Sequence, residues 1–124
     1  MTSELLKHNE LGAKGEEIAF FYLIKNDYKV LEKNWRFKHK EIDIIATKDN
    51  LLIIVEVKSR SNDYFEQPQD AVNRKKQKFI IDATNSYIEK FDIDMEVRFD
   101  IISVIFKDGK HKIEHIEDAF YPLV

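Results

Sequence analysis

The sequence has no cysteine, and only three glycines and two prolines among its 124 residues. Without cysteine the chain cannot form disulfides or thiolate metal sites, so any metal ion would need oxygen or imidazole ligands. The glycines, Gly12, Gly15 and Gly109, do not form a phosphate-cradling glycine loop, and no pattern supports a serine or cysteine nucleophile. The composition therefore excludes several common kinds of active site.

Long apolar runs are also absent. No stretch approaches the length of a membrane span, and the first residues, MTSELLKHNELGAKGEE, lack the basic start and apolar run of a signal peptide. We therefore expect a cytoplasmic protein that has no membrane partner. With 44% apolar and 35% charged residues in 124, residues 1–124 are expected to form a single globular domain.

The net charge is only −3, but the charged residues are unevenly distributed. Four basic and no acidic residues lie between Lys33 and Lys40, and four more basic residues lie between Arg74 and Lys78. Residues 82–100 instead hold six acids and two bases. This pattern allows one basic face on an acidic protein.

Hydrophobic periodicity predicts an alternation of helices and strands. Helices are expected over about residues 5–26 and from Pro68 to about Lys90, and strands over 28–37, 41–47, 51–58, 95–106 and 111–116, with a polar loop over 59–67. The turn residues of KDN predict that the second and third strands form a hairpin. The order predicts an α/β protein in which helices cover a mixed sheet.

The third strand, LLIIVEVKSR, carries Glu56 and Lys58 at the end of an apolar run. Side chains two residues apart on a strand point to the same face, so these charges lie side by side. A charge in such a setting costs several kcal/mol unless it is paired or coordinated. Either the two groups neutralise each other, or they hold something between them.

The preceding strand, EIDIIA, predicts Glu41 and Asp43 on one face, with Ile42 and Ile44 on the other. Through the hairpin, Asp43 can approach Glu56. Two nearby carboxylates repel each other unless one is protonated or a hard cation such as Mg²⁺ lies between them.

Lys58 could then orient a water molecule and offset charge on a phosphoryl group, as metal-assisted phosphodiester hydrolysis requires. The alternative is a structural ion pair of Glu56 with Lys58 and solvated acids on the second strand. Spacing alone leaves both open.

Several segments together carry a family resemblance. KGEEIAFFYL, NWRF, EIDIIA, IIVEVKSR, AVNRKK and RFDIISV occur in order between about Leu11 and Val104. In these motifs the chain resembles the YraN-like family, which belongs to the restriction-endonuclease-like PD-(D/E)xK nuclease superfamily together with archaeal Holliday-junction resolvases. The resemblance implies a restriction-endonuclease-like three-layer α/β/α core and a Mg²⁺- or Mn²⁺-dependent endonuclease acting on DNA, including structured or branched DNA.

The resemblance also implies roles for individual residues. Asp43 resembles the metal-binding aspartate, Glu56 the second metal ligand and Lys58 the catalytic lysine. Glu16 resembles the acid on the first helix that completes or supports the metal site. Helical geometry alone leaves Glu17 nearly as suitable, and only the family pattern selects Glu16.

The sequence departs from the family pattern at two positions. Lys40 stands where the family usually has a glycine. If that glycine has a positive φ, then either the backbone of Lys40 is strained or the turn has a different conformation in this chain. Ile42 replaces the proline that names the superfamily. Neither departure removes a proposed ligand.

Further candidates lie outside the acidic motifs. Residues with a candidate role in nucleic-acid binding are Arg36, Arg60, Lys75 and Lys76, although exposed basic stretches are also commonly just solvated helix faces. Trp35 could stack on an unpaired base, but a packing role is favoured. His111 and His115 are expected on a strand, too far apart to chelate a metal ion, and are expected to be solvated.

Two classes of function therefore remain: a metal-dependent nuclease, or an inactive nucleic-acid-binding or protein-interaction module that works with a protein partner. Metal ligands do not distinguish DNA from RNA, so RNA remains a possible substrate. By analogy with junction resolvases, which cut two strands symmetrically, we expect a homodimer.

Overall fold

A computed structural model describes residues 3–61 and 72–122 of the chain. Its elements are α1 (Ser3–Lys25), β1 (Lys29–Phe37), β2 (Lys40–Lys48), β3 (Leu51–Ser61), α2 (Arg74–Phe91), β4 (Glu96–Lys107) and β5 (Lys110–Phe120). This order confirms the predicted alternation of one helix, three strands, a second helix and two strands. Neither helix, within the part of the chain described, is long and apolar enough to cross a membrane.

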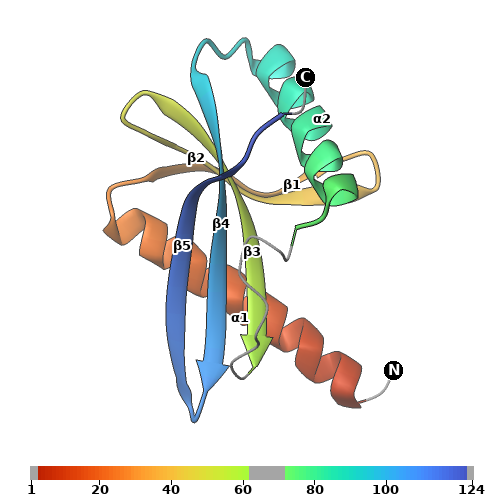
Figure 1. The fold of residues 1–124 in the computed structure, drawn as a ribbon, viewed down its shortest axis with the longest axis vertical. Helices are drawn as coiled ribbons and strands as arrows, with labels where there is room; N and C mark the ends of the chain where they lie inside the picture. Colours follow the sequence, from red (N-terminus) through yellow and green to blue (C-terminus); the bar gives the residue numbers. More distant parts are fainter. Residues whose placement is uncertain (1–2, 62–71, 123–124) are drawn as a thin grey trace.

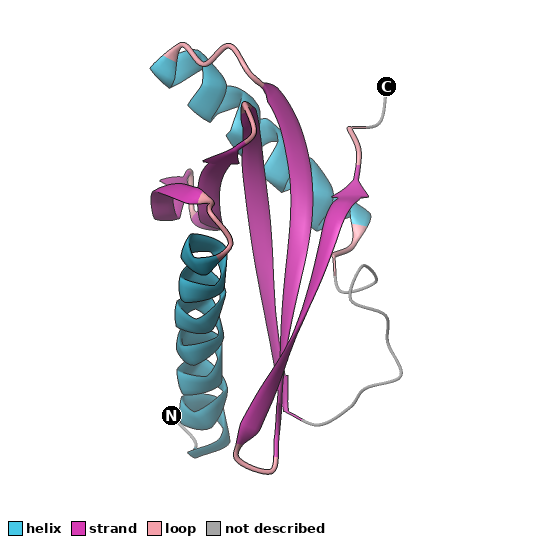
Figure 2. Ribbon diagram, turned by 90° about the vertical axis from the view of Figure 1, so that its left-hand side faces the viewer, coloured by secondary structure: helices cyan, strands magenta, loops and turns pink. Residues whose placement is uncertain are grey.

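The five strands form one mixed sheet in the order β1-β2-β3-β4-β5. Neighbouring strands are antiparallel except β3 and β4, which are parallel and are joined through α2. A parallel connection needs a long crossover, which the helix provides. The two helices lie on opposite faces of the sheet (Figures 1 and 2), which confirms the predicted three-layer α/β/α core of the restriction-endonuclease-like type.

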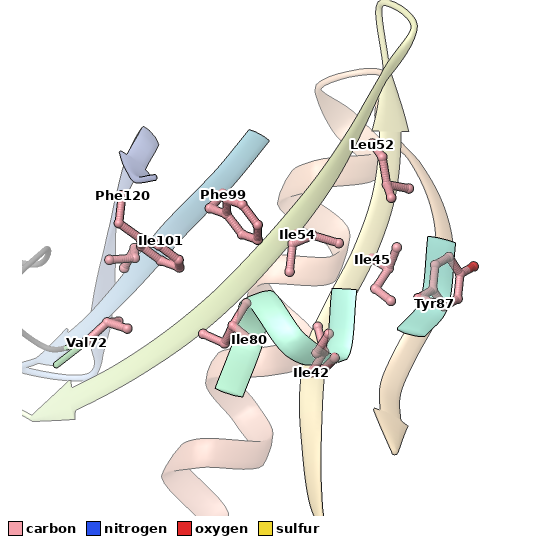
Figure 3. Close-up of a cluster of buried hydrophobic side chains, with 11 residues drawn as sticks. Ile42, Ile45, Leu52, Ile54, Val72, Ile80, Tyr87, Phe99, Ile101 and Phe120 are labelled. Carbon is pink, nitrogen blue, oxygen red and sulfur yellow. The ribbon is translucent and has the colours of Figure 1, made fainter. Parts of the chain in front are cut away.

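Each face of the sheet has its own apolar cluster. On the α2 face, Ile80, Ala83 and Tyr87 pack on buried residues of the strands, among them Ile54 (Figure 3). On the α1 face, Ala19 and Leu23 pack on another set that includes Val55 and Ile102. Because β3 is covered on both sides, it is apolar at every position from Leu51 to Val55.

Three predicted element boundaries were wrong. The second helix begins at Arg74 rather than at Pro68, which lies outside the described residues, because the Asn73 side chain caps it by accepting a hydrogen bond from the backbone of Lys76 at 2.9 Å. β3 continues to Ser61, where a loop was predicted from Ser59, since it stays paired with β4. β5 continues to Phe120 because its pairing with β4 reaches beyond a register shift.

Strand β2 does not alternate regularly at Asp43. Ile42 packs in the cluster under α2, whereas Ile44 packs in the cluster under α1, so the prediction that they share a face was wrong. The irregularity lies opposite Asn34 of β1, which has a φ of 52°. Asn adopts this left-handed conformation more readily than most residues, and the local distortion turns Asp43 away from a regular strand position.

Helix α1 comes close to β3 at Gly15. A Cβ atom built on Gly15 would lie 2.9 Å from Cβ of Ser59 and would also collide with the Ser59 hydroxyl. The Ser59 side chain therefore favours glycine at position 15, whereas a Cβ on Gly12 would meet nothing within 4 Å. The contact fixes the next residue, Glu16, against the sheet.

Candidate metal and catalytic site

The site begins where the β2–β3 ladder ends. The last paired residues are Ile44 and Val55, and at the following position Asp43 Oδ2 accepts a hydrogen bond from the backbone N–H of Val57 at 2.8 Å. The Asp43 side chain thus bonds to β3 just beyond the point where the backbone pairing of β2 with β3 stops. This hydrogen bond holds Asp43 in a fixed orientation beside Glu56.

Helix α1 contributes Glu16. Its carboxyl group lies within electrostatic reach of Asp43 and of the Asn34 side chain. Burial, followed by the charge of Asp43, raises the pKa of Glu16 to about 7. Glu17 is exposed and lines a separate depression with His111, so the structure brings Glu16 to the cluster and leaves Glu17 outside it.

Asp43 and Glu56 form a buried acidic pair. Burial and then the charge of Glu56 raise the pKa of Asp43, and the Val57 N–H opposes that rise only in part. Burial also raises the pKa of Glu56, whose side chain is only 12% exposed. Asp43 therefore has a carboxyl group on each side, Glu16 on α1 and Glu56 on β3, and a proton or a shared cation would relieve the repulsion among them.

The ion pair of Glu56 is made with a lysine from the opposite helix. Lys76 Nζ lies 3.2 Å from Glu56 Oε1 and opposes the effect of burial on the pKa of Glu56 most strongly. Lys58 lowers that pKa more weakly and is itself exposed on β3. The sequence left open a structural ion pair of Glu56 with Lys58. In the structure Glu56 forms its ion pair with Lys76 instead.

The donor set suits a hard divalent cation. Glu16, Asp43 and Glu56 offer carboxylate oxygens, which Mg²⁺ and Mn²⁺ prefer, and their excess negative charge would be relieved by such an ion. Among the described residues, however, no group of three or more histidine, aspartate and glutamate side chains stands ready arranged to hold a metal ion. Metal binding would therefore involve side-chain adjustment, above all at Glu56, which is engaged by Lys76.

The predicted nucleic-acid-binding residues divide into three groups. Arg36 and Lys75 are exposed, as phosphate contacts must be. Lys76 belongs to the acidic cluster. Arg60 is buried, with 8% of its surface exposed, and so adds little to the basic surface.

The two basic segments of the sequence meet in space. The turn between β1 and β2 lies against α2, since the rings of Phe37 and Phe79 are 6.0 Å apart and Lys40 Nζ lies 5.5 Å from the centre of the Phe79 ring. The positive φ of this turn, 58°, occurs at Lys38 rather than at Lys40, so the turn differs and Lys40 is not strained in this way. Trp35 is half-buried and packs edge-on against Tyr87 at 5.1 Å, as the favoured packing role predicts.

The two histidines differ. His111 is exposed, as expected, but the expectation that His115 is solvated was wrong, because its side chain is only 8% exposed. His115 Nε2 lies 2.7 Å from Asp100 Oδ2, and Arg98 donates two hydrogen bonds to the same carboxylate at 2.9 and 2.8 Å. These partners satisfy the buried Asp100, which makes the network structural.

Two contacts of the site were missed from the sequence. Asn34, noted only as a neighbour of Trp35, lies close enough to Glu16 for its side chain to oppose the rise in the pKa of Glu16. Lys76 was considered for phosphate contact but not as the partner of Glu56. No sequence spacing predicts either contact, since each joins elements far apart in the chain.

The comparisons with known proteins agree on one family. The model of the uncharacterised protein family UPF0102 matches residues 15–104, a range that includes every residue of the acidic cluster and both lysines. A UPF0102 protein of Bacteroides thetaiotaomicron is 49% identical over 118 residues, covering 95% of this chain and 98% of the relative. One of Bacteroides fragilis is 51% identical over 118 residues, and one of Flavobacterium psychrophilum 49% over 117, with coverage of 95% and 94% of this chain and 98% of each relative.

Proposed function

Because this chain belongs to the uncharacterised protein family UPF0102, the YraN-like family that its motifs resemble, we propose its activity from the site: it is a metal-dependent nuclease that hydrolyses phosphodiester bonds in DNA. The observation that carries the proposal is the convergence of Glu16, Asp43 and Glu56 from α1, β2 and β3, next to two lysines. Acidic oxygens with a neighbouring cation are what hydrolysis of a phosphodiester needs.

In this mechanism Asp43 and Glu56 would hold a Mg²⁺ or Mn²⁺ ion, and Glu16 would support it directly or through water. When bound, the ion supplies charge stabilisation for the phosphoryl group and lowers the pKa of a water molecule. Lys58, exposed on β3 two residues after Glu56, orients the attacking water and offsets charge on the phosphate. The Val57 N–H keeps the Asp43 carboxylate oriented throughout.

The basic surface formed by the β1–β2 turn and the first turns of α2 supports a nucleic acid as the substrate. Arg36, Lys38 and Lys40 are exposed on the turn, and Lys75 is exposed on the helix. Such cations contribute an electrostatic attraction to phosphates that weakens as salt rises. An acidic protein with this one basic surface therefore binds the backbone of DNA locally.

A panel of substrates tests the proposal. Labelled single-stranded, duplex, flapped and four-way-junction DNA, with matching RNA, is incubated with the wild type, Glu56→Gln and Lys58→Ala in Mg²⁺, Mn²⁺ or EDTA. We expect cleavage of at least one DNA that needs metal and is lost in both variants. Cleavage that survives in both variants would refute the proposed site, and preference for RNA would refute the substrate.

A second function is favoured by one observation. Because the described residues contain no ready-made group of three metal ligands and Glu56 is paired with Lys76, the fold could serve as an inactive nucleic-acid-binding module that acts with a protein partner. This alternative predicts salt-sensitive binding of junction DNA without cleavage under any metal condition. The same panel, run beside a gel-shift assay at low salt, separates the two functions.

A further inference from the structure

The backbone of Lys76 is held in place in the first turn of α2. Its backbone N–H donates to the side chain of the capping residue Asn73 at 2.9 Å, in the first turn of α2. Farther along the helix, Ile80 and Ala83 are buried in the core and hold α2 on the sheet. The position of the lysine stem is therefore set by packing, while its four-carbon side chain remains free to change rotamer.

The ammonium group reaches a buried carboxylate from a partly exposed position. Lys76 Nζ lies 3.2 Å from Glu56 Oε1, and the side chains are 39% and 12% exposed, respectively. Glu56 in turn lies beside Asp43. The Lys76 ammonium group thus contacts a carboxylate that would also be a ligand of a divalent ion.

The second lysine of the cluster is placed differently. Lys58 is exposed on β3, on the same strand as Glu56, and its electrostatic effect on Glu56 is weaker than that of Lys76. Glu16 approaches the acidic pair from α1, on the opposite face of the sheet from α2. Lys76 is therefore the charge that opposes the acidic pair from the α2 face.

We propose that Lys76 is a built-in counter-ion of the metal site, which neutralises Glu56 in the metal-free protein and is displaced from it when a divalent cation binds. The displaced ammonium group is then available to a phosphate oxygen of the substrate. In this arrangement the metal and Lys76 compete for one carboxylate, so Glu56 always has a positively charged partner in its buried position. The inference rests on the proposed metal-dependent function.

The first test measures metal affinity without substrate. Mn²⁺ binding to the full chain is measured by calorimetry for the wild type, Lys76→Met and Lys76→Arg, with Lys75→Met as the matched control on the exposed neighbouring position. Removing a competing unit charge at a partly buried site is expected to tighten Mn²⁺ binding about tenfold in Lys76→Met. Lys76→Arg and Lys75→Met are expected to keep the wild-type affinity.

The second test follows the amine itself. The rate at which an acetylating reagent modifies Lys76 is measured by peptide mass spectrometry, with exposed Lys75 as the internal reference. We expect Lys76 to react several-fold more slowly than Lys75 without metal, and to approach the rate of Lys75 when Mn²⁺ saturates the site. Glu56→Gln is expected to abolish this effect of the metal.

The outcomes separate the two proposals. Mn²⁺ binding by the wild type, with no change in the reactivity of Lys76 and no change in affinity in Lys76→Met, would overturn the counter-ion role and leave the proposed nuclease standing. No detectable Mn²⁺ binding by any of the variants would overturn both proposals together.

Discussion

Replacing Gly15 by alanine tests the contact that sets Glu16 against the sheet. The added Cβ would lie 2.9 Å from Cβ of Ser59, closer than real Cβ contacts allow, so α1 or β3 must shift. Overpacking of this kind costs about 1–3 kcal/mol, against a gain of about 0.5–1 kcal/mol from placing alanine in a helix. We expect Gly15→Ala to lower the free energy of unfolding by about 0.5–2 kcal/mol.

Gly12 provides the matched control on the same helix. A Cβ there would meet nothing within 4 Å, so Gly12→Ala should only gain helix propensity and stabilise the protein by about 0.5–1 kcal/mol. Urea unfolding followed by the fluorescence of Trp35, the single tryptophan, measures both variants. Equal stabilisation by the two substitutions would refute the close approach.

A second substitution can rescue the first. In Ser59→Gly the nearest remaining atom of residue 59 to the new Cβ is Cα at 3.8 Å, an ordinary contact. The double variant with Gly15→Ala should therefore be more stable than the sum of the two single effects by about 1 kcal/mol or more. Simple additivity would contradict the assigned contact.

Three further predictions follow from the buried charges and the helix cap. Asp100→Asn should lower the free energy of unfolding by about 3 kcal/mol, because it leaves Arg98 without its buried partner. Although burial alone would raise it, hydrogen bonds hold the pKa of Asp100 below its usual value, so in urea titrations this difference should be fully present above about pH 4 and should be lost as the pH falls further, through the lowered pKa of Asp100. Burial raises the pKa of Glu16 from 4.5 to about 7, so the folded protein holds this proton more tightly than the unfolded chain does. In EDTA, the free energy of unfolding of the wild type should therefore fall as the pH rises from 4.5 to 7. Glu16→Gln should remove about 1 kcal/mol of that loss after allowance for solvent screening, and an unchanged pH profile would contradict the assigned environment. Asn73→Ala should cost about 1 kcal/mol by removing the cap of α2, whereas Asn85→Ala, at an exposed position inside the same helix, should cost nothing.

The fold could be predicted largely because its signals are local. The apolar run from Leu51 to Val55, the turn residues before it and the long amphipathic segments each predict one element without reference to the rest of the chain. The start of α2 was missed because Pro68 and Asn73 are both acceptable start signals, and only the cap geometry selects Asn73. The lengths of β3 and β5 depend on the pairing partner β4, which no local signal reports.

The site was predictable only in part. Spacing and family resemblance together predicted Glu16, Asp43 and Glu56 as site residues, and the structure places Asp43 beside each of the other two. A regular strand pattern could not predict the irregularity at Asp43, since this depends on the left-handed backbone of Asn34 on the neighbouring strand. Tertiary contacts of this kind override the period-two rule.

Buried charge partners were the least predictable feature. His115 was expected in solvent because a histidine on a polar edge strand usually lies there, yet Asp100 holds it inside. Lys76 was expected to point into solvent because it lies in an exposed basic stretch, yet its ammonium group forms an ion pair with the buried Glu56. Both contacts join residues that are far apart along the chain, and only the folded packing brings them together.

The most direct test of the nuclease is single-turnover cleavage of four-way-junction DNA in Mg²⁺ by the wild type, Asp43→Asn and Asp49→Asn, prepared identically. Asp49 is exposed in the turn after β2 at a φ of 50°, which asparagine tolerates, so its variant controls for a lost carboxylate on the same hairpin. The account predicts cleavage by the wild type and Asp49→Asn and none by Asp43→Asn. Equal cleavage by all three proteins would contradict it.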